Sequence, residues 1–154
     1  EDEWFKAAYY DGSSYFDYPT QSDTVPFDSS PTFNGDNHAN YNDAVGFVTE
    51  VGKYPASASH YGTFDQAGNV AEWTDEVPFG DTRNVRGGSF SDSSSALKAD
   101  KTFGFDADDE FGDLGFRITT SVPEPSAYAA MLGCLGLGLA LIRRKGRGTG
   151  KVLK

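Results

Sequence analysis

Two acidic residues, Asp65 and Glu72, lie in the stretch FDQAGNVAEWT at residues 64–74. The stretch also carries aromatic residues and a glycine-containing turn, as an interior segment does. Acidic side chains are rarely buried without a partner. If this segment is interior, its two carboxylates therefore need a compensating positive charge, from either a metal ion or a basic side chain.

A bound cation is one way to supply that charge. Residues two apart on an extended strand face the same way, so Gly68, Val70 and Glu72 share one side while Trp73 faces the other. A turn before this strand can fold the carboxylate of Asp65 back over the first side. Two carboxylates and two backbone carbonyls make an oxygen cage of the kind that Ca²⁺ takes.

A buried ion pair is the other way. Arg86 in RNVRGGSF and Arg117 in LGFRIT are both candidates, because a guanidinium matches the geometry of a carboxylate. Arg117 is expected to pair with a buried carboxylate. Spacing alone does not decide whether Glu72 binds a cation or an arginine.

The elements that must position these residues are short. The opening EDEWFKAAYY predicts a helix, because acidic residues suit its N-terminus, Trp4, Ala7 and Ala8 share one face, and Gly12 follows its end. Residues 13–45 are predicted to be mostly loop. Abundant Gly, Asn and Asp indicate a loop-rich domain. Strands are predicted at 46–51, 69–74, 83–90 and 114–119.

The charge of the chain is unevenly distributed. All 23 acidic residues precede Ile142, whereas only seven of the 13 lysines and arginines do. The part of the chain before Ile142 therefore carries a formal charge of −16, and the six basic residues after it bring the net charge to −10. Nucleic-acid binding needs a basic footprint, so we expect no nucleic-acid partner. Cation binding and simple solubility both fit this charge. The single cysteine, Cys134, excludes an intrachain disulfide.

The pattern of residues predicts three parts. Residues 1–120 are the acidic globular part, 121–126 are a proline-rich linker, and 127–142 are apolar. As a helix the apolar segment would span about 24 Å, short of the ~30 Å hydrocarbon core, which makes it a marginal transmembrane helix. A basic flank stays cytoplasmic, so the globular part is expected outside. A buried core helix and a permanent anchor are the alternatives.

The C-terminal part resembles the PEP-CTERM sorting signal over residues 122–147. The resemblance rests on a Pro-Glu-Pro motif, the apolar segment and a basic cluster, in that order: Val122, Pro123, Glu124, Pro125 and Ser126, then 127–142, then Arg143, Arg144 and Lys145. It implies recognition by an exosortase in a Gram-negative, exopolysaccharide-producing bacterium. The membrane would hold the C-terminal helix until the tail is removed during export.

Residues 1–119 resemble the formylglycine-generating enzyme, or sulfatase-modifying factor, family. Five segments carry the similarity in family order: EDEWFKAAYYDG (1–12), HANYNDAVGFVTEVGKYP (38–55), YGTFDQAGNVAEWT (61–74), RNVRGGSF (83–90) and DLGFRI (113–118). The helix match implies that an N-terminal part of the domain, with any signal peptide, is missing. The resemblance implies an α+β, C-type-lectin-like fold with little regular secondary structure.

The family resemblance also implies two bound calcium ions. By position, the first would be held by the side chains of Asp65 and Glu72 and the carbonyls of Gly68 and Val70. The second would be held by the side chains of Asn40 and Asp43 and the carbonyls of Tyr41 and Val45, in a loop much shorter than that of catalytic members. Ala71 stands where the family usually has a tryptophan.

The resemblance bears on catalysis as well. Catalytic members oxidise a sulfatase cysteine to formylglycine with O₂, using a copper ion held by two cysteines, and thiolates suit Cu(I) because both are soft. The two positions follow the RGGS motif and here carry Asp92 and Leu97. We therefore expect no copper. Other members are iron oxidases that use histidines, but His38 and His60 lie in loop-like contexts.

These expectations combine into one leading hypothesis. It is a non-catalytic, calcium-stabilised domain that is exported and sorted to the cell surface or exopolysaccharide matrix, where it binds a glycan or a partner protein or serves as structure. The alternative is a metal-dependent oxidoreductase of the same family that acts on a protein or a small thiol. A truncated gene product is a third reading.

Overall fold

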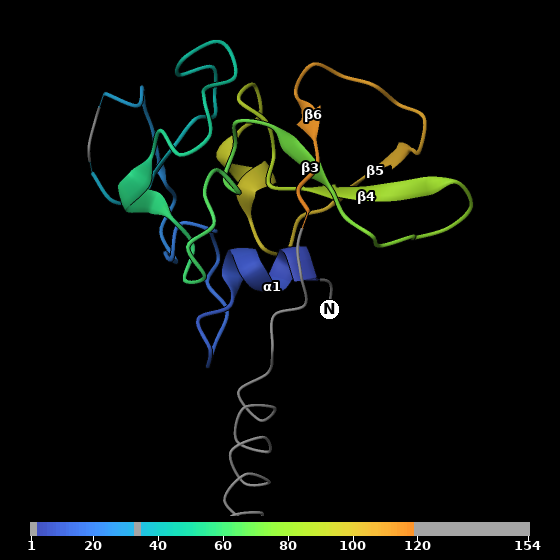
Figure 1. The fold of residues 1–154 in the computed structure, drawn as a ribbon, viewed down its shortest axis with the longest axis horizontal. Helices are drawn as coiled ribbons and strands as arrows, with labels where there is room; N and C mark the ends of the chain where they lie inside the picture. Colours follow the sequence, from blue (N-terminus) through green and yellow to red (C-terminus); the bar gives the residue numbers. More distant parts are fainter. Residues whose placement is uncertain (1–2, 33–34, 119–154) are drawn as a thin grey trace, which may run out of the picture. The chain divides into compact units, whose positions relative to one another are not determined.

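The computed structural model describes residues 3–32 and 35–118 (Figure 1). These residues belong to the first of two units into which the chain divides, Glu1–Ser121 and Val122–Lys154. The predicted linker at 121–126, the apolar segment at 127–142 and the predicted sorting signal at 122–147 lie outside the described residues. Within residues 3–32 and 35–118, no helix is long and apolar enough to cross a membrane.

The elements are few and short. In chain order they are α1 (Glu3–Tyr9), β1 (Phe27–Asp28), β2 (His38–Ala39), the 3₁₀-helix η1 (Pro55–Ser57), β3 (Ala71–Trp73), β4 (Thr82–Arg86), the 3₁₀-helix η2 (Ser94–Leu97), β5 (Phe103–Asp106) and β6 (Leu114–Gly115). Strands β1 and β2 pair in parallel as a separate small sheet. The described part is therefore an α+β fold with little regular structure, in agreement with the sequence-based prediction.

Helix α1 forms where the sequence predicts it. Its predicted apolar face is buried, with Trp4 at 4%, Ala7 at 6% and Ala8 at 2% exposure. Trp4, Ala8 and Tyr9 form one cluster of the core. The chain turns after the helix at Gly12, whose φ of +97° favours glycine.

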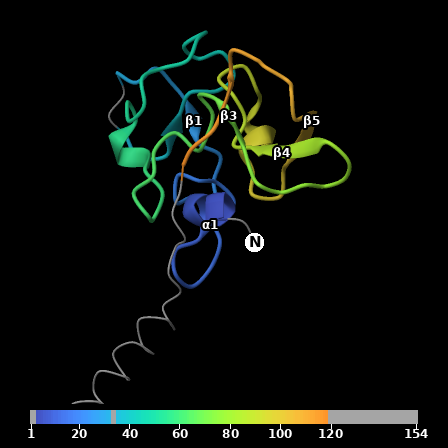
Figure 2. The same cartoon turned by 45° about the vertical axis from the view of Figure 1, so that its right-hand side comes forward.

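The main sheet has four strands in the order β5-β4-β3-β6. Strand β4 runs antiparallel to β3 and β5, whereas β6 runs parallel to β3. The register pairs Trp73 with Val85, Val85 with Phe103, and Ala71 with Leu114. Paired residues share a face of a sheet, so these side chains form one apolar face. In Figures 1 and 2 the β3–β4 loop extends away from this sheet.

The strand predicted at 46–51 is wrong. Glycines with positive φ bound this segment, Gly46 at +83° and Gly52 at +82°, and its apolar side chains are exposed, with Phe47 at 62% and Val51 at 80%. Its backbone is bound by a side chain rather than by a strand, because the Thr49 amide donates to Asn69 Oδ1 at 2.7 Å. Strands β1, β2 and β5 were not predicted, while β3, β4 and β6 occupy parts of predicted strands.

Candidate functional site

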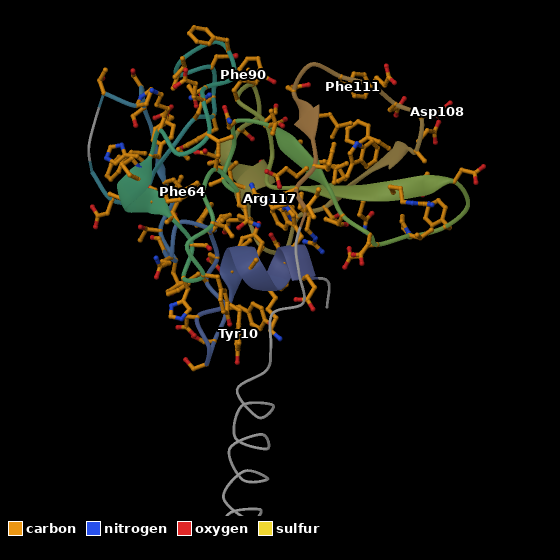
Figure 3. The ribbon with its side chains drawn as sticks, viewed as in Figure 1. Tyr10, Phe64, Phe90, Asp108, Phe111 and Arg117 are labelled. Carbon is orange, nitrogen blue, oxygen red and sulfur yellow. The ribbon has the colours of Figure 1, made fainter. Side chains whose placement is uncertain are left out.

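Glu72 is the buried charge at the centre of the fold. It projects from β3 with 4% exposure, on the side opposite Ala71 and Trp73. Both of its carboxylate oxygens accept hydrogen bonds from the Arg117 guanidinium, and Trp4 Nε1 donates to Oε2 at 2.6 Å. Arg117 also donates to the Phe64 carbonyl at 3.0 Å; Figure 3 labels both residues. The predicted pairing of Arg117 with a buried carboxylate is confirmed.

Asp65 lies close to this ion pair. Its backbone has a φ of +58°, and its Oδ2 accepts a hydrogen bond from the Gly52 amide at 2.6 Å. Burial is the main effect on its carboxyl and raises the pKa above 3.8; the Gly52 amide and Arg117 lower it, and Glu72 raises it further. Burial, with a smaller effect of Asp65, also raises the pKa of Tyr54 to about 12.

The two carboxylates therefore share one electrostatic environment, as the sequence predicted, but a guanidinium supplies the positive charge. Arg117 binds both oxygens of Glu72, so this carboxylate is already neutralised. The turn that carries the two predicted carbonyl ligands, Gly68 and Val70, packs against another segment: the Asn69 amide donates to the Asn40 carbonyl at 2.8 Å. Glu72 is therefore paired with Arg117 in this structure, and the first calcium site stays a prediction.

The second predicted calcium site contains a buried oxygen without a partner. Asn40 is 1% exposed and its Nδ2 donates to the Phe47 carbonyl at 2.9 Å. Among residues 3–32 and 35–118, its Oδ1 has no hydrogen-bond partner. A buried unsatisfied acceptor is costly, and a cation or a water molecule would satisfy it. Asn40 therefore fits the role of a metal ligand.

The other predicted ligands of this second site are more exposed than Asn40 or already hydrogen-bonded. Asp43 is exposed, with a φ of +55°, and its amide donates to the Phe90 carbonyl at 2.9 Å. The Tyr41 carbonyl accepts from the Ala44 amide at 3.0 Å, and Val45 is half-buried. No group of three or more His, Cys, Asp or Glu side chains suited to a metal occurs in the described part of the chain.

The turn after β4 positions Asp92. Gly87 and Gly88 have φ of +87° and +66°, and a Cβ on Gly87 would lie 2.7 Å from the Gln66 carbonyl oxygen, so a bend here requires glycine. Asp92 Oδ2 then accepts from the Ser89 amide at 2.8 Å and from the Ser89 hydroxyl at 3.0 Å. These bonds hold its carboxylate in place.

Leu97, the second position of interest, lies elsewhere. It is fully buried in a core cluster with Tyr18, Ala39, Tyr41 and Ala67, and its carbonyl accepts from the Tyr9 hydroxyl at 3.1 Å. Asp92 and Leu97 therefore lie in different surroundings: Asp92 is held in a turn, whereas Leu97 fills the core.

A pocket of about 250 Å³ lies on the apolar face of the main sheet. We call it the Ala71 pocket, after the small residue on β3 that lines it. It is bordered by the turn at Asp92 and by the loop between β5 and β6. Its lining is Ala71, Val85, Ser89, Ser91, Asp92, Phe103, Phe105, Phe111, Asp113 and Leu114.

Aromatic rings shape one wall of the Ala71 pocket. Phe105 and Phe111 meet edge to face with centroids 5.7 Å apart, and Phe105 packs in the same way on Trp73 at 6.3 Å. A shallower hollow adjoins it through Asp113 and includes Phe47, Phe90 and Gly112; Figure 3 labels Phe90 and Phe111.

Sequence reasoning did not find most of this pocket. It noted Ala71 and Asp92 as single positions and Asp113 only as the start of the segment at 113–118, and it did not note Phe103 or Phe105. The alternation in FGFD at 103–106 is a strand signal that could have indicated an aromatic face. The two histidines do not meet a metal-binding pattern: His38 Nδ1 lies 2.7 Å from the Ser29 hydroxyl, and His60 is exposed.

Comparisons with known proteins agree with this architecture. A family model described as the sulfatase-modifying factor enzyme 1-like domain matches residues 1–122. Among solved structures, Treponema denticola variable protein 1 is similar, with a TM-score of 0.53 and 26% sequence identity over 74% of this chain and 43% of that one. The chain thus spans less than half the length of that protein. No curated protein matches.

Proposed function

The chain belongs to the sulfatase-modifying factor enzyme 1-like family, and on that premise we propose that it is a non-catalytic binding domain whose ligand enters the Ala71 pocket. The observation that carries this proposal is the pocket itself, which joins an apolar floor to convergent polar groups. Binding sites for small molecules commonly have this make-up. At about 250 Å³, the pocket is suited to a small molecule or one long side chain.

The residue types at the two positions after the RGGS turn support a non-catalytic role. Asp92 presents a hard carboxylate, and Leu97 presents a hydrocarbon side chain within the core. Cu(I) prefers soft thiolates. These two positions do not fit a copper ion, and no copper-dependent step is part of the proposal.

Calcium enters the proposal only as a structural ion. The support for it is the buried Oδ1 of Asn40, which has no hydrogen-bond partner among the described residues. Asp43 and the carbonyls of Tyr41 and Val45 are the further ligands that the family resemblance implies. The pair of Asp65 and Glu72 is left out, because Arg117 already neutralises Glu72. Export and sorting by an exosortase, to the cell surface or exopolysaccharide matrix, is proposed from the sequence pattern at 122–147 alone.

Two-dimensional NMR of the full chain tests the binding function. The probes are n-pentylamine, an organic cation, and methyl glucoside, a neutral sugar that represents the proposed glycan ligands. At least one probe is expected to shift the amide signals of Ala71, Asp92 and Asp113 together. Probes that leave all three signals unchanged would refute the pocket as a binding site.

A pocket-filling variant makes this test specific. Ala71→Trp should abolish those shifts, because an indole would occupy the pocket volume. The matched control is Ala56→Trp, at an exposed position of η1 that does not line the pocket, and it should bind like the wild type. Equal binding by both variants would place the ligand elsewhere.

A further inference from the structure

Resting on the proposed binding function, we infer that the Ala71 pocket selects an alkylammonium group, that is, a protonated amine at the end of an apolar stem. A lysine side chain and a free aliphatic amine both present this chemistry. The inference comes from three properties of the pocket: aromatic walls, two carboxylates from separate segments, and a lining without a basic residue.

The aromatic walls suit both parts of such a ligand. Phe103 and Phe105 project from β5 and Phe111 from the loop that follows, and all three line the pocket. An alkyl stem gains by leaving water against such surfaces. The negative face of each ring also attracts an ammonium group.

The two acidic residues that line the pocket come from separate segments. Asp92 lies in the turn after β4, fixed by its hydrogen bonds to Ser89 through Oδ2, and Asp113 immediately precedes β6. Among the described residues, the carboxylate of Asp113 makes no hydrogen bond or ion pair. Two like charges beside an apolar floor are costly to desolvate without a counter-charge, and a ligand ammonium would supply it.

The surrounding charge excludes the opposite kind of ligand. Asp106 ends β5, and the loop between β5 and β6 adds Asp108, Asp109 and Glu110; Figure 3 labels Asp108 and Phe111 in this loop. Arg83, on the same side of β4 as Val85, donates to the Thr82 carbonyl and does not line the pocket. An anion would be repelled, and a neutral sugar would leave both carboxylates uncompensated, whereas a field of this sign attracts cations.

Matched pairs of probes test the selection in the full chain. We expect n-pentylamine to bind at least about tenfold more tightly than 1-pentanol, its neutral analogue, by NMR titration of the Ala71 and Asp113 amides. Asp113→Asn should weaken amine binding about tenfold without changing alcohol binding. Asp75→Asn, the same charge change at an exposed position outside both the lining and the loop between β5 and β6, should leave the amine affinity within about twofold.

The outcomes separate this inference from the proposed function. Equal affinities for amine and alcohol, or tighter binding of methyl glucoside, would overturn the cation inference while the binding function stands. No shift with any of the three probes would overturn both. Nα-acetyl-lysine-N-methylamide then identifies the source of the ammonium group. If it binds as tightly as n-pentylamine, the natural ligand is a lysine side chain of a protein; if it does not bind, the ligand is a free amine. Either result supports an alkylammonium ligand.

Discussion

Replacing Glu72 with glutamine is expected to destabilise the chain strongly. The Glu72 side chain is 5% exposed and accepts hydrogen bonds from the Arg117 guanidinium and from Trp4. The NH₂ group of the glutamine would face the N–H donors of Arg117 and Trp4, and the guanidinium would lose its counter-charge. Removing one partner of a buried ion pair costs about 3–5 kcal/mol. Because the Arg117 side chain is 24% exposed, water solvates part of its charge, and we expect the lower end, about 3 kcal/mol.

The assay is urea unfolding, followed by far-UV circular dichroism and by the fluorescence of Trp4 and Trp73. The matched control is Glu50→Gln, which removes a carboxylate from the exposed pair of Glu50 and Lys53, 2.8 Å apart. Exposed pairs contribute little, so no measurable change is expected there. Glu72→Met, Arg117→Met and the double variant complete a cycle, in which the double variant should recover about 2 kcal/mol of the summed losses.

Two results would refute this reasoning. The first is equal unfolding midpoints for Glu72→Gln and Glu50→Gln, which would show that the buried pair is not needed. The second is a silent Arg117→Met together with a wild type that EDTA destabilises as much as Glu72→Gln does. That combination would show that a metal ion, and not Arg117, neutralises Glu72.

Three further predictions concern the segments that surround this pair. Burial raises the pKa of Asp65, so its folded form holds its proton to higher pH than the unfolded chain; its contribution to stability is full below 3.8 and is lost as pH rises through the raised value. Asp65→Asn should therefore gain stability relative to wild type over that rise, and a constant difference across a pH series of urea titrations would contradict this. Gly68→Ala should lower the free energy of unfolding by at least about 1–3 kcal/mol, because φ is +73° and the added Cβ would lie 2.1 Å from the Asn40 carbonyl oxygen. The control is Gly80→Ala, at φ +60° with no atom near the added Cβ. Equal decreases in melting temperature for the two variants would argue against the close approach at Gly68. Saturating calcium should raise the melting temperature of wild type but not of Asn40→Ala, and an unchanged wild-type melting temperature would remove the ion from the proposal.

The local parts of the fold follow from the sequence. Helix α1 was predictable because its apolar face and the glycine after its end are local features of the sequence, set by residues such as Trp4 and Gly12. The strand wrongly predicted at 46–51 has a suitable apolar pattern, but it pairs with no strand in the described part of the chain. Instead, Asn69 binds its backbone from a distant turn. Period-two patterns do not show whether such a partner exists.

The site was predictable only in part, because its contacts join distant segments. Spacing could not choose between a metal and Arg117 for Glu72, and the third partner, Trp4, is 68 residues away in the chain. The Ala71 pocket depends on the register of β5 beside β4 and on Asp113 beside β3, which no local pattern specifies. The family resemblance did indicate that Ala71 stands in place of a tryptophan, and the structure has a pocket at this residue.

A crystal structure of the full chain grown with n-pentylamine tests the central claim most directly. We predict density for the alkyl stem against Phe105 and Phe111, over Ala71, with the ammonium group between the carboxylates of Asp92 and Asp113. An Ala71 pocket closed by a side chain of the protein itself, or an amine bound only elsewhere, would contradict the account.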